Sequence, residues 1–128
     1  MPKFADYQAT ARQRGALALE LFVITSTPAV PPEEMQKHLP AHLVYQQARE
    51  TDRSLVLAGP LSDVGGENIE GAGLIIYRAE SLAAARALAE ADPMHANGAR
   101  SYDLRRWLVN EGSLSLDVGL STGRVSLA

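Results

Sequence analysis

Cysteine is absent from the 128 residues, which excludes disulfides, thiol catalysis and any metal site that uses a thiolate. No apolar run approaches the roughly 18 to 20 residues of a membrane span, and the first residues lack the apolar stretch of a secretion signal. A basic excess is also missing, because 12 Lys and Arg oppose 15 Asp and Glu. Since nucleic-acid-binding domains usually carry a basic patch, we expect a cytoplasmic protein that binds neither nucleic acid nor membrane.

Hydrophobic residues make up 46% of the chain, enough for one buried core. The length predicts a single domain. Within it we expect an N-terminal helical extension over residues 1–16, a core over residues 17–111, and a C-terminal hairpin or tail over residues 112–128.

The N-terminal half reads as helix, strand, loop and helix. Helical spacing over Phe4–Arg14 ends at Gly15, which suits a left-handed helix cap. A central strand is predicted over 17–26 and a proline-rich loop over 27–32. From residue 33 to 53 the pattern is helical but contains Pro40. Either one helix kinks there, or a short turn precedes a helix that begins at Pro40; the second reading is favoured because proline suits a helix start.

The second half repeats the alternation of strands and helices. Leu55–Ala58 predicts a short strand that stops at Gly59-Pro60. Ser81 is expected to cap a helix that ends at Asp92-Pro93. The other predicted elements are a polar loop over 62–71, a strand over 73–78, a turn over 94–98, a strand over 99–109 and a hairpin in the alternating tail.

The predicted order of the core is β-α-β-β-α-β, the ferredoxin-like arrangement of the α+β class. It gives an antiparallel sheet with both helices on one face. The opposite face keeps apolar side chains that are costly to leave in water. We therefore expect a homodimer through this sheet face, as in dimeric α/β barrels, or a higher oligomer.

Three short motifs stand in register along this core. Pro40-Ala41-His42 is followed, seventeen residues after the histidine, by the glycine of Ala58-Gly59-Pro60. Asp92-Pro93 is followed by Gly98, six residues after the aspartate. Together, from about residue 19 to 111, these features resemble the YciI-like (YCII-related) family of small dimeric proteins.

The resemblance implies a fold related to dimeric α/β barrels such as muconolactone isomerase, and a paired histidine and aspartate in a pocket beside the sheet. Those roles fall on His42 and Asp92. One related member removes chloride from a chlorinated hydroxyhydroquinone, which connects the family with the degradation of aromatic compounds. Leu39 stands where many relatives carry an arginine.

The residues themselves are compatible with acid–base chemistry. His42 lies near the start of a helix, where the positive end of the helix dipole favours a neutral ring. A carboxylate on one ring nitrogen would fix the tautomer and support the protonated form. Structural roles are equally open: a hydrogen-bonded core histidine, and an aspartate in the turn before proline. His38 and His42 are four residues apart, but Pro40 between them argues against a metal pair.

Four further residues are candidates for contacting a substrate: Tyr45, Met94, His95 and Arg105. Arg100, Arg105 and Arg106 cluster on the last predicted core strand, where an arginine could hold an anionic substrate. The favoured function is a lyase or isomerase that needs no cofactor or metal and moves a proton on a small oxygenated ring compound, with His42 as base and Asp92 as its orienting partner. The alternatives are a binding or accessory protein that uses the same pocket without turnover, and a structural partner whose tail grips another chain.

Overall fold

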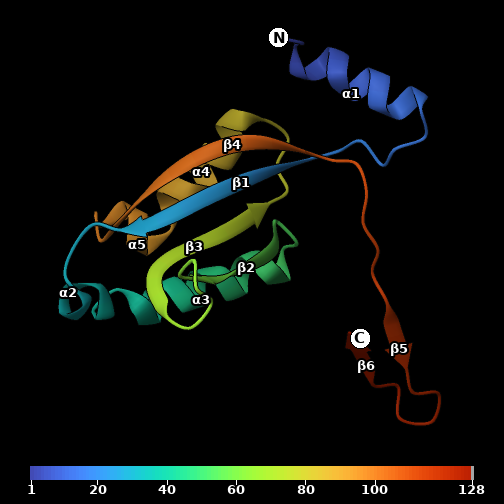
Figure 1. Cartoon of the computed structure of the whole chain (residues 1–128). Helices are drawn as coiled ribbons and strands as arrows, with labels where there is room; N and C mark the ends of the chain where they lie inside the picture. The colour runs from blue at the N-terminus through green and yellow to red at the C-terminus, as the bar shows by residue number, and fades with distance from the viewer. Residues whose placement is uncertain (128) are drawn as a thin grey trace. The chain divides into compact units, whose positions relative to one another are not determined.

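The structure is a computed structural model that describes residues 1–127 (Figure 1). It consists of two compact units, residues 20–107 and residues 1–19 with 108–127. The elements in chain order are α1 (Phe4–Gln13), β1 (Leu19–Pro28), α2 (Pro32–Gln36), α3 (Leu39–Thr51), β2 (Leu55–Ser62), β3 (Ile69–Tyr77), α4 (Leu82–Ala91), α5 (Pro93–Ala96), β4 (Arg100–Val109), β5 (Leu116–Val118) and β6 (Val125–Leu127).

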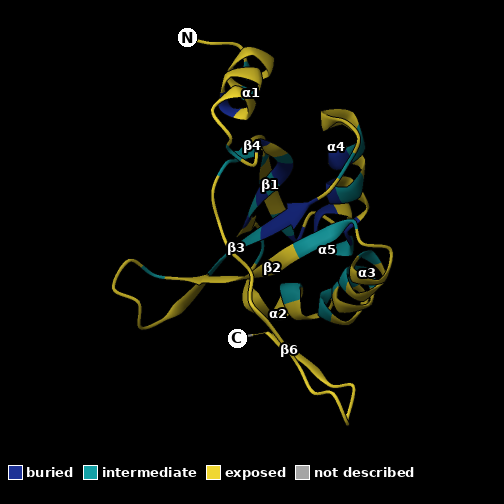
Figure 2. Ribbon diagram, turned by 90° about the vertical axis from the view of Figure 1, so that its right-hand side faces the viewer, coloured by how far each residue is buried: buried dark blue, intermediate teal, exposed yellow. Residues whose placement is uncertain are grey.

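The larger unit is the predicted ferredoxin-like core. Its strands form one antiparallel sheet in the order β2-β3-β1-β4, and α3, α4 and α5 lie on one face of it (Figure 2). Phe22 and Ile24 of β1 and Tyr77 of β3 are buried against Ala85 and Ala89 of α4. The small alanine side chains allow the helix to approach the sheet closely. The fold class expected from the sequence is therefore confirmed.

The opposite face of the sheet carries no helix of this unit (Figure 2). Because side chains alternate along a strand, Val23 and Thr25 point away from the helices and pair across the sheet with Ile76 and Leu74. These residues, with Arg105 and Trp107 among others, line a hollow of about 580 Å³.

Several predicted boundaries in the core are wrong, beginning with β1, which runs to Pro28 inside the predicted loop over 27–32. β2 continues through Gly59-Pro60 to Ser62. A proline is tolerated there because β2 is an edge strand, so the missing amide hydrogen of Pro60 breaks no bond of the sheet. β3 begins at Ile69, inside the predicted polar loop, because pairing with β2 extends the strand beyond its apolar part. The short helix α5 begins at Pro93 and takes up the first part of the predicted turn over 94–98.

The segment that contains Pro40 forms two separate elements, as the favoured interpretation predicted. A short helix, α2, comes first, and α3 follows it. The new helix starts at Leu39 and has Pro40 in its first turn. Ser81 caps α4 as predicted, since its hydroxyl accepts the Ala84 N–H at 3.0 Å.

The smaller unit contains α1 and the hairpin formed by β5 and β6. Gly15 ends α1 with φ at +86°, and the bonds Gly15 N–H to Arg12 O and Ala16 N–H to Ala11 O form a Schellman motif. In the hairpin Leu116 pairs with Leu127 and Val118 with Val125. Within residues 1–127, no helix is both long enough and apolar enough to cross a membrane.

Candidate functional site

Asp92 occupies the junction between α4 and α5. Its extended backbone, with φ −61° and ψ 124°, ends α4 one residue before Pro93. Its carboxylate then caps α5 by accepting the Met94 N–H at 3.0 Å. The side chain is fully buried, with 0% exposed. The Asp-Pro sequence thus places a carboxylate inside the protein, where it needs hydrogen-bond donors.

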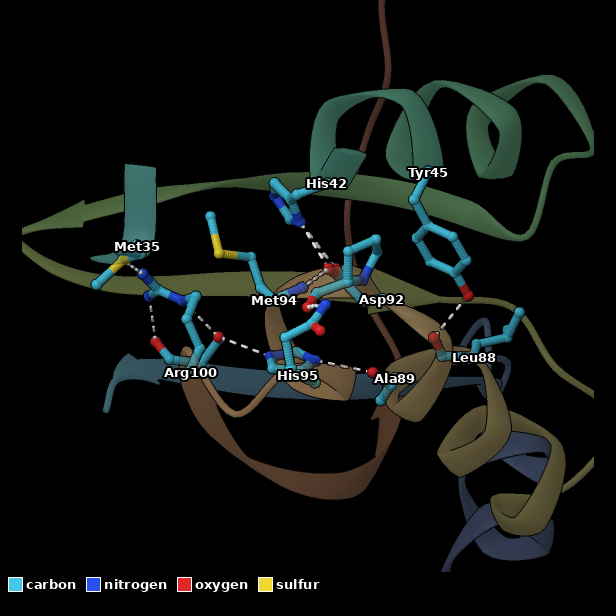
Figure 3. Close-up of polar contacts among 12 residues, drawn as sticks. Met35, His42, Tyr45, Leu88, Ala89, Asp92, Met94, His95 and Arg100 are labelled. Atoms are coloured by element: carbon cyan, nitrogen blue, oxygen red, sulfur yellow. Dashed lines mark hydrogen bonds and ion pairs between the residues drawn. The ribbon is translucent and has the colours of Figure 1, made fainter. Parts of the chain in front are cut away.

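His42 supplies the second donor from α3. Its Nδ1 lies 2.8 Å from Asp92 Oδ1 and 2.9 Å from Oδ2 (Figure 3). His42 is the fourth residue of α3, which begins at Leu39. The two side chains that the sequence predicted would meet are therefore in direct contact across 50 residues.

The contact determines which ring nitrogen of His42 remains available. A buried carboxylate can only accept, so the hydrogen of a neutral ring lies on Nδ1 and the lone pair lies on Nε2. Nε2 has no hydrogen-bond partner within residues 1–127. The His42 side chain is 16% exposed and forms part of a cavity wall. The arrangement therefore presents a basic nitrogen, backed by a carboxylate, to a space that solvent can reach.

The cavity has a volume of about 340 Å³, within the usual size of small-molecule sites. Mainly apolar groups form its wall, including Leu39 and Leu43 of α3, Met94 of α5 and Leu74 and Ile75 of β3. Ser26, Gln46 and Arg100 add polar groups. A hollow of this size and composition can enclose a small molecule.

A second buried network lies at the same wall. His95 is 8% exposed, and its Nδ1 lies 2.8 Å from the Ala89 carbonyl oxygen. Because a carbonyl only accepts, that nitrogen carries the hydrogen, and Nε2 accepts the Ser26 hydroxyl at 2.9 Å. The Ser26 oxygen in turn accepts Arg100 Nε–H at 2.8 Å. The chain of bonds joins α4, α5, β1 and β4 (Figure 3).

The other predicted substrate contacts are distributed differently. Met94 lies on the cavity wall, whereas His95 lies behind it and reaches it through Ser26. Tyr45 donates its hydroxyl to the Leu88 carbonyl at 2.6 Å and is not part of the wall. Burial raises its pKa. Arg105 lines the hollow on the opposite face of the sheet.

Sequence reasoning passed over Arg100 in favour of Arg105. The alternation of side chains along a strand could have identified Arg100. It is two residues from Tyr102 and four from Leu104, so it points to the same face of the sheet as these two residues, which pack against the core. Arg105 has the opposite parity. His38 sits at the start of α3, and within residues 1–127 no group of three His, Asp or Glu side chains is arranged to hold a metal ion.

A family model for the YCII-related domain matches residues 18–108. The chain belongs to the YCII-related family. No curated protein is significantly similar to it in sequence. Among solved structures, it is similar to 5-chloro-2-hydroxyhydroquinone dehydrochlorinase from Burkholderia phenoliruptrix in complex with 2,5-dihydroxybenzoquinone. The match has a TM-score of 0.51 and 20% identity, and covers 68% of this chain and 92% of the other. At that identity the likeness shows a shared fold.

Proposed function

We propose that this YCII-related protein is a lyase or isomerase that moves a proton on a small oxygenated ring compound bound in the 340 Å³ cavity. The observation that supports this most directly is the contact of His42 with the buried Asp92 at the cavity wall. A base whose second nitrogen is held by a carboxylate is a general acid–base device.

In the proposed reaction, His42 Nε2 takes a proton from a carbon or hydroxyl of the ring compound. The electron pair of the broken bond moves into the ring, and Asp92 stabilises the imidazolium through Nδ1–H. In an isomerisation, the same proton returns from Nε2 to another position of the ring. In a dehydrochlorination, the electron pair expels chloride from the neighbouring carbon, so that hydrogen chloride is lost overall. The structural neighbour is named for the second type of reaction.

The test uses purified protein and a panel of hydroxylated quinols, chlorinated hydroxyquinols and lactones, including the neighbour's named substrate. Conversion is followed by ultraviolet absorbance and by chloride release. The informative variant is His42→Asn, because the asparagine amide can still donate to Asp92 from the position of Nδ1 while Nε2 is lost. We expect conversion of at least one compound to fall by roughly 10²–10⁴-fold. Full activity in this variant would exclude His42 as the base.

A binding protein without turnover would give a different result in the same experiment. Ring compounds would bind to the wild-type protein in calorimetry, and His42→Asn would weaken them, yet no compound of the panel would be converted. That outcome would favour the non-catalytic use of the cavity.

We also propose that a second copy covers the exposed sheet face, giving a homodimer. Leu57 is 69% exposed on β2 and Trp107 is 45% exposed on β4. Leu57 pairs with Ile76, which places it on the face without helices. Because Leu57 is already exposed, Leu57→Glu should leave the subunit folded but convert dimer to monomer in light scattering. Val64→Glu is the matched control, since Val64 is fully exposed in the loop between β2 and β3. A monomeric wild-type protein would refute the proposal.

A further inference from the structure

Arg100 lines the same cavity as His42 and comes from the start of β4. Its guanidinium is held on several sides. Nε donates to Ser26 Oγ at 2.8 Å, Nη2 donates to the carbonyl oxygens of Ser26, at 3.0 Å, and of Gly71, and Nη1 donates to Met35 Sδ at 3.2 Å. Four of the five N–H groups are therefore directed at protein atoms, and one on Nη1 is left.

All of these partners are neutral. Within residues 1–127 no carboxylate forms an ion pair with Arg100, whereas Arg106 of the same strand pairs with Glu20 at 2.9 Å. Among the cavity-lining residues, Arg100 is the only one that carries a permanent charge, and His42 is the only other ionisable group. Burial lowers the pKa of Arg100, and the negative charge of Asp92 acts in the opposite direction. The guanidinium nevertheless remains charged at neutral pH, since arginine is not deprotonated in proteins.

The guanidinium is also fixed in position before any ligand binds. Ser26 Oγ can accept from Arg100 because its own hydrogen is directed to His95 Nε2, and His95 is anchored to the Ala89 carbonyl. A partly buried cation with neutral partners has lost hydration without gaining a counter-ion. An anionic group that entered the cavity would supply that counter-ion, and little conformational entropy would be lost in the process.

We propose that the cavity selects ring compounds that carry an anionic oxygen, either a carboxylate or an ionised ring hydroxyl, and that Arg100 is the residue that holds this oxygen. The inference rests on the proposed use of the cavity as the reaction site. It assigns complementary tasks to two residues of one wall: Arg100 binds the negative oxygen, and His42 moves the proton. Negative charge that spreads into the ring when His42 removes the proton would be stabilised by the same guanidinium.

The test compares ligands that differ in charge and little else. Salicylate and salicylamide have the same ring, hydroxyl and size, and 2,5-dihydroxybenzoquinone, the ligand in the neighbour's structure, provides an ionised ring hydroxyl without a carboxylate. Affinities are measured by calorimetry at low salt. We expect the wild-type protein to bind salicylate at least roughly tenfold more tightly than salicylamide. The proposal would be overturned if neither salicylate nor 2,5-dihydroxybenzoquinone bound more tightly than salicylamide, or if none of the three bound at millimolar concentration.

Two variants and a control assign the preference to a residue. In Arg100→Gln the preference for salicylate should disappear while the affinity for salicylamide is unchanged; in Arg100→Lys part of the preference should remain. Arg105→Gln is the matched control, because it removes the same charge from the same strand on the opposite face. A preference that survives Arg100→Gln would refute the role. Because the wild-type comparison needs no variant, the proposal can fail even if Arg100→Gln does not fold.

The two proposals fail in different ways. Anion binding through Arg100 without conversion of any compound would leave this inference standing and contradict the proposed reaction. Conversion that depends on His42, with neutral compounds preferred and Arg100→Gln fully active, would leave the reaction standing and contradict this inference. Comparing the carboxylate with the ionised hydroxyl then identifies which anionic oxygen the cavity accepts.

Discussion

Removing His42 and Asp92 singly and together measures their contact without any knowledge of the substrate. The pair is shielded from solvent, with the carboxylate fully buried and the imidazole 16% exposed, and the closest N···O distance is 2.8 Å. A hydrogen bond to a charged group contributes about 1.5–3 kcal/mol to the free energy of unfolding, and shielding places this pair within that range rather than below it.

The single variants differ in what they leave behind. His42→Ala leaves a buried carboxylate whose remaining donor is the Met94 N–H, so we expect a cost of about 3 kcal/mol. Asp92→Asn removes the charge but keeps an oxygen that can accept from Met94. On that background the uncompensated carboxylate no longer exists, and His42→Ala should cost only about 1 kcal/mol.

The assay is urea unfolding of the wild-type protein, the two single variants and the double variant, followed by circular dichroism at neutral pH. The expected coupling energy is about 2 kcal/mol, with the slope of unfolding free energy against urea unchanged across the four proteins. A coupling below about 0.5 kcal/mol would mean that the two changes act independently. In that case the His42–Asp92 contact does not form in solution, and the proposed acid–base pair loses its basis.

The remaining predictions concern stability. Tyr77→Phe should raise the unfolding free energy by about 1 kcal/mol, because the buried Tyr77 hydroxyl has no hydrogen-bond partner within residues 1–127. Tyr45→Phe should lower the unfolding free energy by about 1 kcal/mol, because the hydrogen bond to the Leu88 carbonyl is lost. Destabilisation by both changes would contradict this reading of Tyr77. Burial raises the pKa of both phenols in the folded state. Unfolded tyrosine therefore releases its proton first above about pH 10, and stability should fall there by up to about 1.4 kcal/mol per pH unit for each phenol, which chemical unfolding at several pH values would test. Gly71→Ala should cost about 2–4 kcal/mol in thermal or urea unfolding, because φ is +112° and an added Cβ would lie 2.6 Å from Pro28 Cγ. The control Gly65→Ala should be close to neutral, because the added Cβ would meet only Asp63 Oδ1, at an ordinary contact distance of 3.7 Å.

Local sequence signals determined most of the secondary structure. Gly15, Ser81 and Pro93 each act on the backbone within a few residues, so the ends of α1 and α4 follow from the residues alone. The order of the elements then leaves few topologies, and the ferredoxin-like sheet is the one observed. The ends of the strands were harder to predict from the sequence, because β2 and β3 continue as far as they can pair with each other. Pairing between distant segments leaves little trace in the composition of either one.

The sequence also supplied the two partners of the candidate dyad, through motif spacing and the Asp-Pro junction. Which arginine faces the cavity was decided by tertiary structure. Arg100 and Arg105 are five residues apart on one strand and therefore point to opposite faces of the sheet. The face toward which Arg100 points is the cavity side only because α3, α4 and α5 pack on that face. The shared wall of His42 and Arg100 likewise depends on the meeting of α3, α5 and the start of β4, segments that lie far apart in the chain. The sequence by itself determines the chemistry of each residue and the local preference of the backbone. The side of the sheet on which that chemistry acts is determined by the burial of apolar surface between segments far apart in the chain.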